Sequence, residues 1–185
     1  MIGVQDLRKG VTFELDGDLY RVLEYQHHKP GRGNAVIRTK LRNLRTGSTI
    51  DRNFTSGDRV QDVRLEKRTL QYLYSDEHLY HFMDIDTYEQ PIVPTKAVGG
   101  AAQYLKEGMT IDVLFHQREA LDIELPVTVD LEVTVTEPGV KGDTATGATK
   151  GATLETGLVV QVPLFVEQGD VIRVDTRTGE YLTRA

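Results

Sequence analysis

The sequence contains no cysteine, which excludes disulfides, cysteine-based zinc sites, iron–sulfur clusters and thiol nucleophiles. It also lacks any apolar run near the ~18–20 residues that a membrane-spanning helix requires, and its first residues do not resemble a secretion signal. No serine nucleophile motif, phosphate-binding loop or dinucleotide fingerprint occurs in it. We therefore expect a cytoplasmic, non-enzymatic protein that has no association with membranes.

The net charge of the 185 residues is −6, which argues against a generic nucleic-acid-binding protein. This average hides an asymmetry. Residues 1–64 carry 12 Lys and Arg against 8 Asp and Glu, a net charge of +4, whereas the remainder carries −10. The first segment is therefore expected to contact something anionic.

Alternating apolar and polar residues, which are typical of half-buried strands, dominate the chain. The clearest runs are 19–25, 111–115, 127–135 and 171–175, separated by glycine turns. The one helix candidate is 95–106, with Thr95 as a possible N-cap. Many short strands without a βαβ alternation predict small β-barrels. Composition suggests three domains, at 1–64, 65–126 and 127–185.

A weak internal repeat supports more than one barrel. A glycine stands just before a short alternating strand at Gly10, Gly108 and Gly169. The alternative explanation, that any β protein reuses such a turn, stays open at this point.

The segment 27–34, His-His-Lys-Pro-Gly-Arg-Gly-Asn, is predicted to be a hairpin tip between strands 19–25 and 35–44. Pro30 and Gly31 fit the central positions of a type II turn, and Gly33 with Asn34 lets the chain reverse after Arg32. The tip then presents the long cationic side chain of Arg32. His28 and Lys29 also belong to the predicted tip.

On the returning strand, Arg38, Lys40 and Arg42 occupy alternate positions and so share one face. A row of cations that leads to an arginine between glycines is suited to clamping a phosphate backbone. The alternative interpretation is that Arg32 is an ordinary exposed turn residue and that the row is a solvated strand edge.

Other candidate sites are weaker. His27 and His28 are adjacent on a strand and face opposite sides, so they do not chelate one metal ion. Asp84, Asp86 and Glu89 resemble a metal or acid–base cluster, with Asp84 and Asp86 on one strand face, but an acidic strand exit explains them as well. We expect no metal and no cofactor. Residues 140–150 form a glycine-rich loop suited to approaching a ribose-phosphate chain or, equally, to a plain surface loop.

These motifs make the chain similar to bacterial translation elongation factor P over its whole length. The strongest match is C-terminal, where Lys150, Ala152, Gly157, Val160, Val162, Pro163, Val166 and Gly169 stand at the family spacing. The tip at 29–33 and the segment 86–90, Asp-Thr-Tyr-Glu-Gln, also resemble the family.

The resemblance implies an SH3-like, KOW-type barrel followed by two OB-fold barrels in an L-shaped, tRNA-like arrangement. It implies a monomer that binds the 70S ribosome between the peptidyl-tRNA and exit sites and relieves stalling at consecutive prolines. Arg32 would approach the acceptor end of the peptidyl-tRNA, with Arg38, Lys40 and Arg42 on the tRNA backbone. Gly142, Asp143 and Thr144 would face the messenger codon in the exit site, and Tyr181 and Arg184 would contact small-subunit rRNA.

Many family members carry lysine at the tip, whereas this chain has Arg32. The resemblance to an arginine-bearing subgroup implies possible rhamnosylation of Arg32, and an unmodified arginine stays open. Two further alternatives also stay open, a generic OB-fold RNA-binding protein and the elongation factor P-like paralogue.

Overall fold

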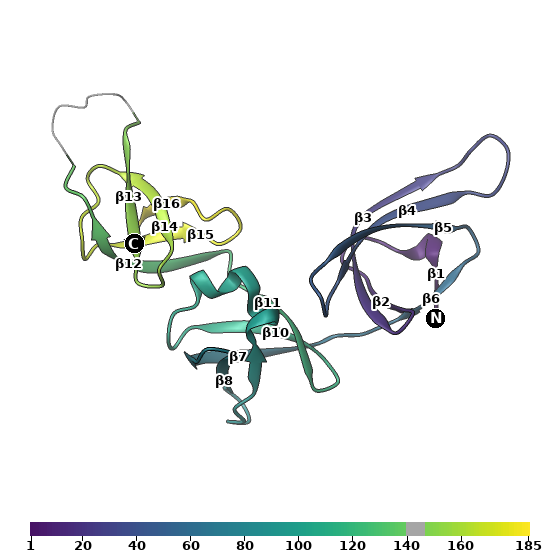
Figure 1. Ribbon diagram of the computed structural model, residues 1–185, viewed down its shortest axis with the longest axis horizontal. Helices are drawn as coiled ribbons and strands as arrows, with labels where there is room; N and C mark the ends of the chain where they lie inside the picture. The colour runs from purple at the N-terminus through teal and green to yellow at the C-terminus, as the bar shows by residue number, and fades with distance from the viewer. Residues whose placement is uncertain (140–146) are drawn as a thin grey trace. The chain divides into compact units, whose positions relative to one another are not determined.

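The computed structural model describes residues 1–139 and 147–185 and shows a β protein with three curled sheets (Figure 1). The all-β fold class expected from the alternating residues is confirmed. By its internal contacts the chain forms two compact units, one of residues 1–68 and 114–122 and the other of residues 69–113 and 123–185. The boundaries at 64 and 126 stay predictions.

The first sheet has the strand order β1-β6-β2-β3-β4-β5 and encloses an apolar core. A 3-10 turn at Val4–Asp6 follows the first strand. Phe13 and Phe54 meet edge-to-face in the core, with ring centroids 6.1 Å apart. The strands are β1 (Ile2–Gly3), β2 (Thr12–Leu15), β3 (Asp18–His28), β4 (Val36–Asn43), β5 (Thr49–Thr55) and β6 (Arg59–Asp62).

The second sheet has the order β11-β10-β7-β8-β9. Its strands are β7 (Glu66–Ser75), β8 (Leu79–Asp84), β9 (Ile92–Pro94), β10 (Thr110–His116) and β11 (Glu119–Glu124). The third sheet has the order β14-β13-β12-β15-β16. Its strands are β12 (Thr128–Thr136), β13 (Thr149–Leu154), β14 (Val159–Pro163), β15 (Val171–Asp175) and β16 (Tyr181–Arg184).

The predicted helix at 95–106 is much shorter than expected. Helix α1 covers only Thr95–Val98 and continues as a 3-10 helix, η2, over Gly99–Tyr104. The α-helix ends because Gly99 adopts φ 52°, a conformation that only glycine accepts readily. The N-cap assignment was also wrong, since Pro94 is the cap residue and the Thr95 hydroxyl donates instead to the carbonyl of His78 at 2.8 Å.

The glycine repeat is a true structural repeat of the three sheets. Gly10, Gly108 and Gly169 all have φ between 83° and 90°. In each case the glycine N–H donates to the carbonyl of a strand residue. The N–H of that strand residue donates in turn to the carbonyl of the residue after the glycine. The strand residues are Val22, Tyr72 and Val133, and the six N···O distances lie between 2.8 and 3.0 Å.

A β-bulge follows the strand residue in all three sheets, at Val22/Glu24, Tyr72/Tyr74 and Val133/Val135. A bulge bends and twists its strand, so the same turn and bulge curl each sheet toward a barrel. The turn is therefore more than a generic feature of β proteins, and it supports three related barrels.

A second repeat was not recognised in the sequence. Each sheet contains a buried Asn or Asp that ends a strand, and its side-chain oxygen accepts backbone N–H groups from the following turn. Four residues later the backbone adopts a positive φ of 61° to 76°. The three buried residues are Asn43, Asp84 and Asp175, and the positive-φ residues are Gly47, Tyr88 and Gly179.

Candidate nucleic-acid interface

Strands β3 and β4 form a long antiparallel arm, paired from Tyr20 with Asn43 to His28 with Val36. The arm projects beyond the rest of the first sheet (Figure 1). At its base, the alternating pattern buries Val22, Ile37 and Leu41 in the core. The hydrophobic face therefore fixes the arm on the barrel, and the other face of β4 is left to polar side chains.

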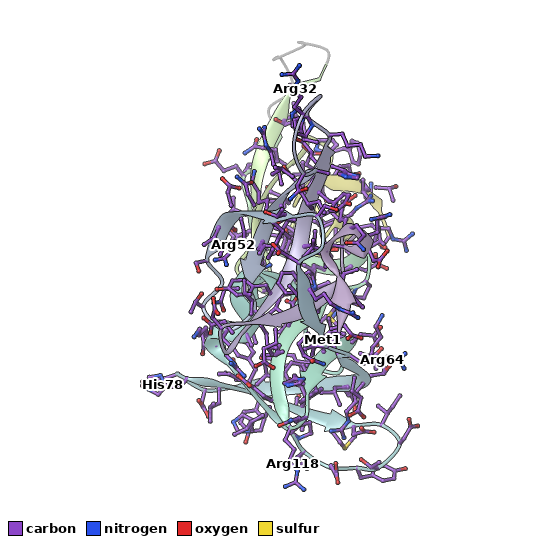
Figure 2. All side chains as sticks on the ribbon, turned by 90° about the vertical axis from the view of Figure 1, so that its right-hand side faces the viewer. Met1, Arg32, Arg52, Arg64, His78 and Arg118 are labelled. Atoms are coloured by element: carbon purple, nitrogen blue, oxygen red, sulfur yellow. The ribbon has the colours of Figure 1, made fainter. Side chains whose placement is uncertain are left out.

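Arg32 lies at the end of this arm and is exposed (Figure 2). Its guanidinium has no hydrogen bond or ion pair with residues 1–139 and 147–185. Arg32 therefore reaches solvent, as the predicted role of the tip in binding a phosphate backbone requires. Among the other predicted tip residues only Pro30 is half-buried. The exposed ones are His28, Lys29, Gly31, Gly33 and Asn34.

The backbone of the tip differs from the predicted type II turn. Such a turn needs a positive φ at Gly31, but the positive φ, 104°, lies at Gly33. The bend covers residues 31–33, so Arg32 lies within it. Glycine is needed at position 33 for its conformation and not for space, because an added Cβ there would meet no atom within 4 Å.

The predicted face of β4 is confirmed: Arg38, Lys40 and Arg42 point away from the core, and Ile37, Thr39 and Leu41 are buried. Lys40, however, lies between two carboxylate residues. It is opposite Glu24 on β3 and opposite Asp51 on β5, and its Nζ is 3.5 Å from Glu24 Oε1.

Two further cations of the arm and its base are also paired. Arg21 forms a salt bridge with Asp122 at 2.9 Å, and each side chain is only 21% exposed. Arg45 approaches Glu119 at 3.5 Å and donates to the carbonyl of Gly17. Among residues 21–45, four cations have no hydrogen-bond or ion-pair partner among the described residues, and these are Lys29, Arg32, Arg38 and Arg42. All four are exposed, so they are the groups that can bind an anion.

Sequence reasoning had no signal for the pairing of Arg21 and Arg45, because their partners in β11 lie 101 and 74 positions further along the chain and meet them only through the fold. Asp51 lies on the next strand, so its position near β4 could be expected from the sequence. The strand register that places it opposite Lys40 could not be predicted.

The acidic cluster at 84–89 has a structural role. Asp84 is buried at the end of β8, and its carboxylate accepts the N–H groups of Asp86 and Thr87 at 2.9 and 3.1 Å. Asp86 lies in the turn, so the prediction that it shares a strand face with Asp84 is wrong. His27 and His28 are exposed. Within residues 1–139 and 147–185, no three His, Asp or Glu side chains are placed to hold a metal ion.

The remaining predicted contacts are in the last barrel. Gly142, Asp143 and Thr144 lie outside the described residues. Tyr181 is half-buried against the core, and Arg184 is exposed with its guanidinium 5.5 Å from the ring centroid of Phe165. Phe165 was not singled out in the sequence. The signal that could have found it is an aromatic residue just past a strand that ends in proline.

Comparison with known sequences agrees with this architecture. Family models match as the elongation factor P KOW-like domain over residues 3–60, the elongation factor P OB domain over 65–123, and the C-terminal region of elongation factor P over 129–184. The fold and its matches define a β-barrel protein of translation. The chain belongs to the elongation factor P family, and it is a translation elongation factor.

Two curated relatives are similar over their full length. The elongation factor P of Moorella thermoacetica is 54% identical over 185 residues, and that of Pelotomaculum thermopropionicum is 52% identical over 184, with complete coverage of both chains. A solved structure, eukaryotic translation initiation factor 5A from Methanococcus jannaschii, superposes with a TM-score of 0.54 at 20% identity. It covers 66% of this chain and 90% of its own, and it shows similarity of fold alone. The family is named for translation and not for catalysis, and no helix within the described part of the chain is long and apolar enough to span a membrane.

Proposed function

We propose that this protein binds the 70S ribosome between the peptidyl-tRNA and exit sites and relieves stalling at consecutive prolines. It does so by holding the acceptor end of the peptidyl-tRNA in a reactive position. The observation that carries the proposal is Arg32, an exposed guanidinium that lies at the end of a projecting β-arm and has no partner among the described residues. Membership of the elongation factor P family supports the ribosome as the partner.

Peptide-bond formation requires the attacking amine and the ester to be held close and aligned. Proline fixes its own φ and removes rotational freedom, so the reacting groups are easily misaligned. A factor that aligns them needs no acid, base or nucleophile of its own. A gain of ~2.7 kcal/mol from positioning already accelerates the step about a hundredfold, and the ribosome remains the catalyst.

Arginine suits this role because its guanidinium stays charged and donates in a planar fork to phosphates or base edges. Lys29, Arg38 and Arg42 then bind the tRNA backbone and fix the position of the arm on it, since they too are exposed and unpaired among the described residues. Lys40 contributes less to this binding because Glu24 and Asp51 flank it.

The acidic remainder of the chain limits non-specific binding to RNA. Specificity for the ribosome then comes from shape and from a few contacts in the last barrel. These contacts include Tyr181 and Arg184 on small-subunit rRNA and the 142–144 loop, Gly-Asp-Thr, near the exit-site codon. We place the protein in the cytoplasm as a monomer.

Arg32 is also the proposed site of rhamnosylation. Its exposed guanidinium is free to accept a rhamnosyl group from an activated sugar donor. In that transfer a guanidine nitrogen bonds to the sugar's anomeric carbon, the bond from that carbon to the leaving group breaks, and the nitrogen loses one proton. Intact mass spectrometry of natively expressed protein tests this, because an unmodified mass contradicts it.

A toe-print assay on a Pro-Pro-Pro message tests the function. We expect Arg32→Ala to abolish most of the rescue while the Tm stays within about 1 °C, since surface substitutions change stability little. Arg118→Ala is the matched control, because Arg118 is also exposed and unpaired among the described residues in a hairpin turn (Figure 2). Normal rescue by Arg32→Ala, or equal loss with Arg118→Ala, would refute the tip assignment. Co-sedimentation with 70S ribosomes separates this factor from a generic OB-fold protein.

A further inference from the structure

Phe165 is a large aromatic side chain that the last barrel leaves 57% exposed. It lies in the turn after β14, and its neighbour Val166 is completely buried. The Val166 N–H donates to the carbonyl of Pro163 at 3.1 Å and closes the turn. The fold therefore fixes the backbone on one side of Phe165 and directs its ring away from the core.

The backbone on the other side is fixed as well. Gly139 lies so close to Leu164 that an added Cβ would collide with the Leu164 carbonyl oxygen. Only glycine allows this approach, because any other side chain would displace the backbone of Leu164. Phe165 is thus held between two anchored residues, and its exposure is a property of a rigid turn.

Arg184 lies over the Phe165 ring, with its guanidinium carbon 5.5 Å from the ring centroid. A bulge in β16 brings it there. Tyr181 is opposite Val174 and Arg184 is opposite Ile172, and β16 has one extra residue between these two pairs. Tyr181 and Arg184 therefore lie on the same face of the sheet as the buried Val174 and Ile172. Arg184 Nε also forms a long ion pair with Asp170 Oδ2 at 3.8 Å. This distance is too long for a hydrogen bond, so the N–H donors of Arg184 can still reach a ligand, although Asp170 offsets part of its charge.

We propose that Phe165 and Arg184 form a binding site for single-stranded RNA, in which an unpaired base stacks on the Phe165 ring and Arg184 binds the adjacent phosphate. Stacking on an aromatic ring beside a cation is the usual way in which OB folds hold single strands. The choice of RNA as the partner rests on the proposed ribosomal function. The site itself is independent of the arm that carries Arg32.

Tyr74 shows why exposure alone is not sufficient. It is 58% exposed and stacks on His81 with centroids 4.3 Å apart. His81, however, is hydrogen-bonded at 3.0 Å to Asp76. That bond and two backbone N–H groups lower the pKa of Asp76 to about 2, so its carboxylate stays ionised and repels phosphate. Tyr74 is therefore a matched control with similar exposure, but with a carboxylate and, among the described residues, no arginine beside its ring pair.

The chain contains no tryptophan, so a single introduced indole reports on its own site. We expect saturable quenching of the emission of Phe165→Trp by a hexaadenylate RNA, and little quenching with an abasic hexamer of the same charge. Tyr74→Trp should respond weakly to both. Equal quenching of the two variants, or equal binding of the abasic hexamer, would overturn the proposal, because either result indicates collision or charge alone.

Affinity measurements with the same RNA separate stacking from charge. Phe165→Ala should weaken binding at least fivefold, whereas Phe165→Tyr should retain it. Arg184→Gln should weaken binding and lower the salt dependence by roughly one phosphate contact. Unchanged affinity in Phe165→Ala would refute the site, and circular dichroism shows whether the variants are folded.

The ribosome provides the final test. A photo-crosslinking phenylalanine analogue at position 165 should crosslink to rRNA or messenger RNA in 70S complexes, and crosslinking only to protein would contradict the proposal. Arg32→Ala should leave the RNA quenching of Phe165→Trp unchanged. If Phe165 and Arg184 do not bind RNA, rescue that depends on Arg32 persists. If Arg32 does not act on the tRNA, the quenching of Phe165→Trp by RNA persists.

Discussion

Lys40 Nζ lies 3.5 Å from Glu24 Oε1, and Asp51 faces Lys40 from the opposite strand. The central cation of the basic row on β4 is therefore partly neutralised within the arm. Arg38 and Arg42, two positions away on either side, have no such partner in the described structure. Three cations that look equivalent in the sequence are thus unequal as phosphate ligands.

This inequality predicts different salt dependences for ribosome binding. Arg38→Ala and Arg42→Ala should each weaken 70S binding and lower the slope of log K against log salt by about one contact. Lys40→Ala should change the slope by clearly less, because Lys40 already has carboxylate neighbours. Filter binding at several salt concentrations measures the slopes. An equal loss at all three positions would show that the pairing has no effect.

Gly33→Ala is expected to misplace Arg32 without unfolding the barrel. The residue at position 33 needs φ 104°, which costs an L-residue about 1–2 kcal/mol, although the added methyl group has free space. The tip should relax to another conformation and lower rescue in the toe-print assay, with little change in Tm. Gly31→Ala, where φ is not positive, is the control and should be milder. A normal rescue rate in Gly33→Ala would mean that the tip geometry is unimportant.

The third barrel should lose stability in acid through Asp175. The Arg177 side chain and backbone N–H groups lower the pKa of this carboxyl from 3.8 to about 2. Because the folded-state pKa is the lower one, the stabilisation is complete above about pH 4 and is lost as the pH falls toward 2. Urea unfolding should show a gap between the wild type and Asp175→Asn at neutral pH that narrows over this window. A double variant with Arg177→Gln should add little more, and a gap that persists at pH 2 would contradict the ion pair.

Tyr88→Gly should raise stability. Tyr88 has φ 61° at the position where the other two barrels carry Gly47 and Gly179, and its ring is 73% exposed. Relief of the left-handed conformation should outweigh the extra chain entropy of glycine and yield up to about 1 kcal/mol. Ile85→Gly, in the same turn but without a positive φ, should destabilise. Urea denaturation compares the two, and a lower stability of Tyr88→Gly would show that the tyrosine makes a compensating contact.

Much of the arm was predictable because its signals are local. Alternation along β4 alone assigns Arg38, Lys40 and Arg42 to one face and Ile37, Thr39 and Leu41 to the other, and the structure agrees. The turn type was not predictable. Two glycines flank Arg32, and the pattern does not reveal which of them takes the positive φ. The ribosomal roles of these residues, the domain boundaries and the L-shaped arrangement stay predictions.

The sequence by itself determined the β-barrel class, the separation of charge between the first 64 residues and the rest, and the single arginine between tip glycines. Period-two burial depends on the order of neighbouring residues, and the charge of a segment depends only on its composition, so both can be identified from the sequence alone. Only the tertiary structure decided which cations remain free. Salt bridges such as Arg21 with Asp122 join residues about a hundred positions apart, and strand register set Asp51 beside Lys40. Pairing of charges depends on distance in space, which barrel closure and register define and local sequence patterns do not.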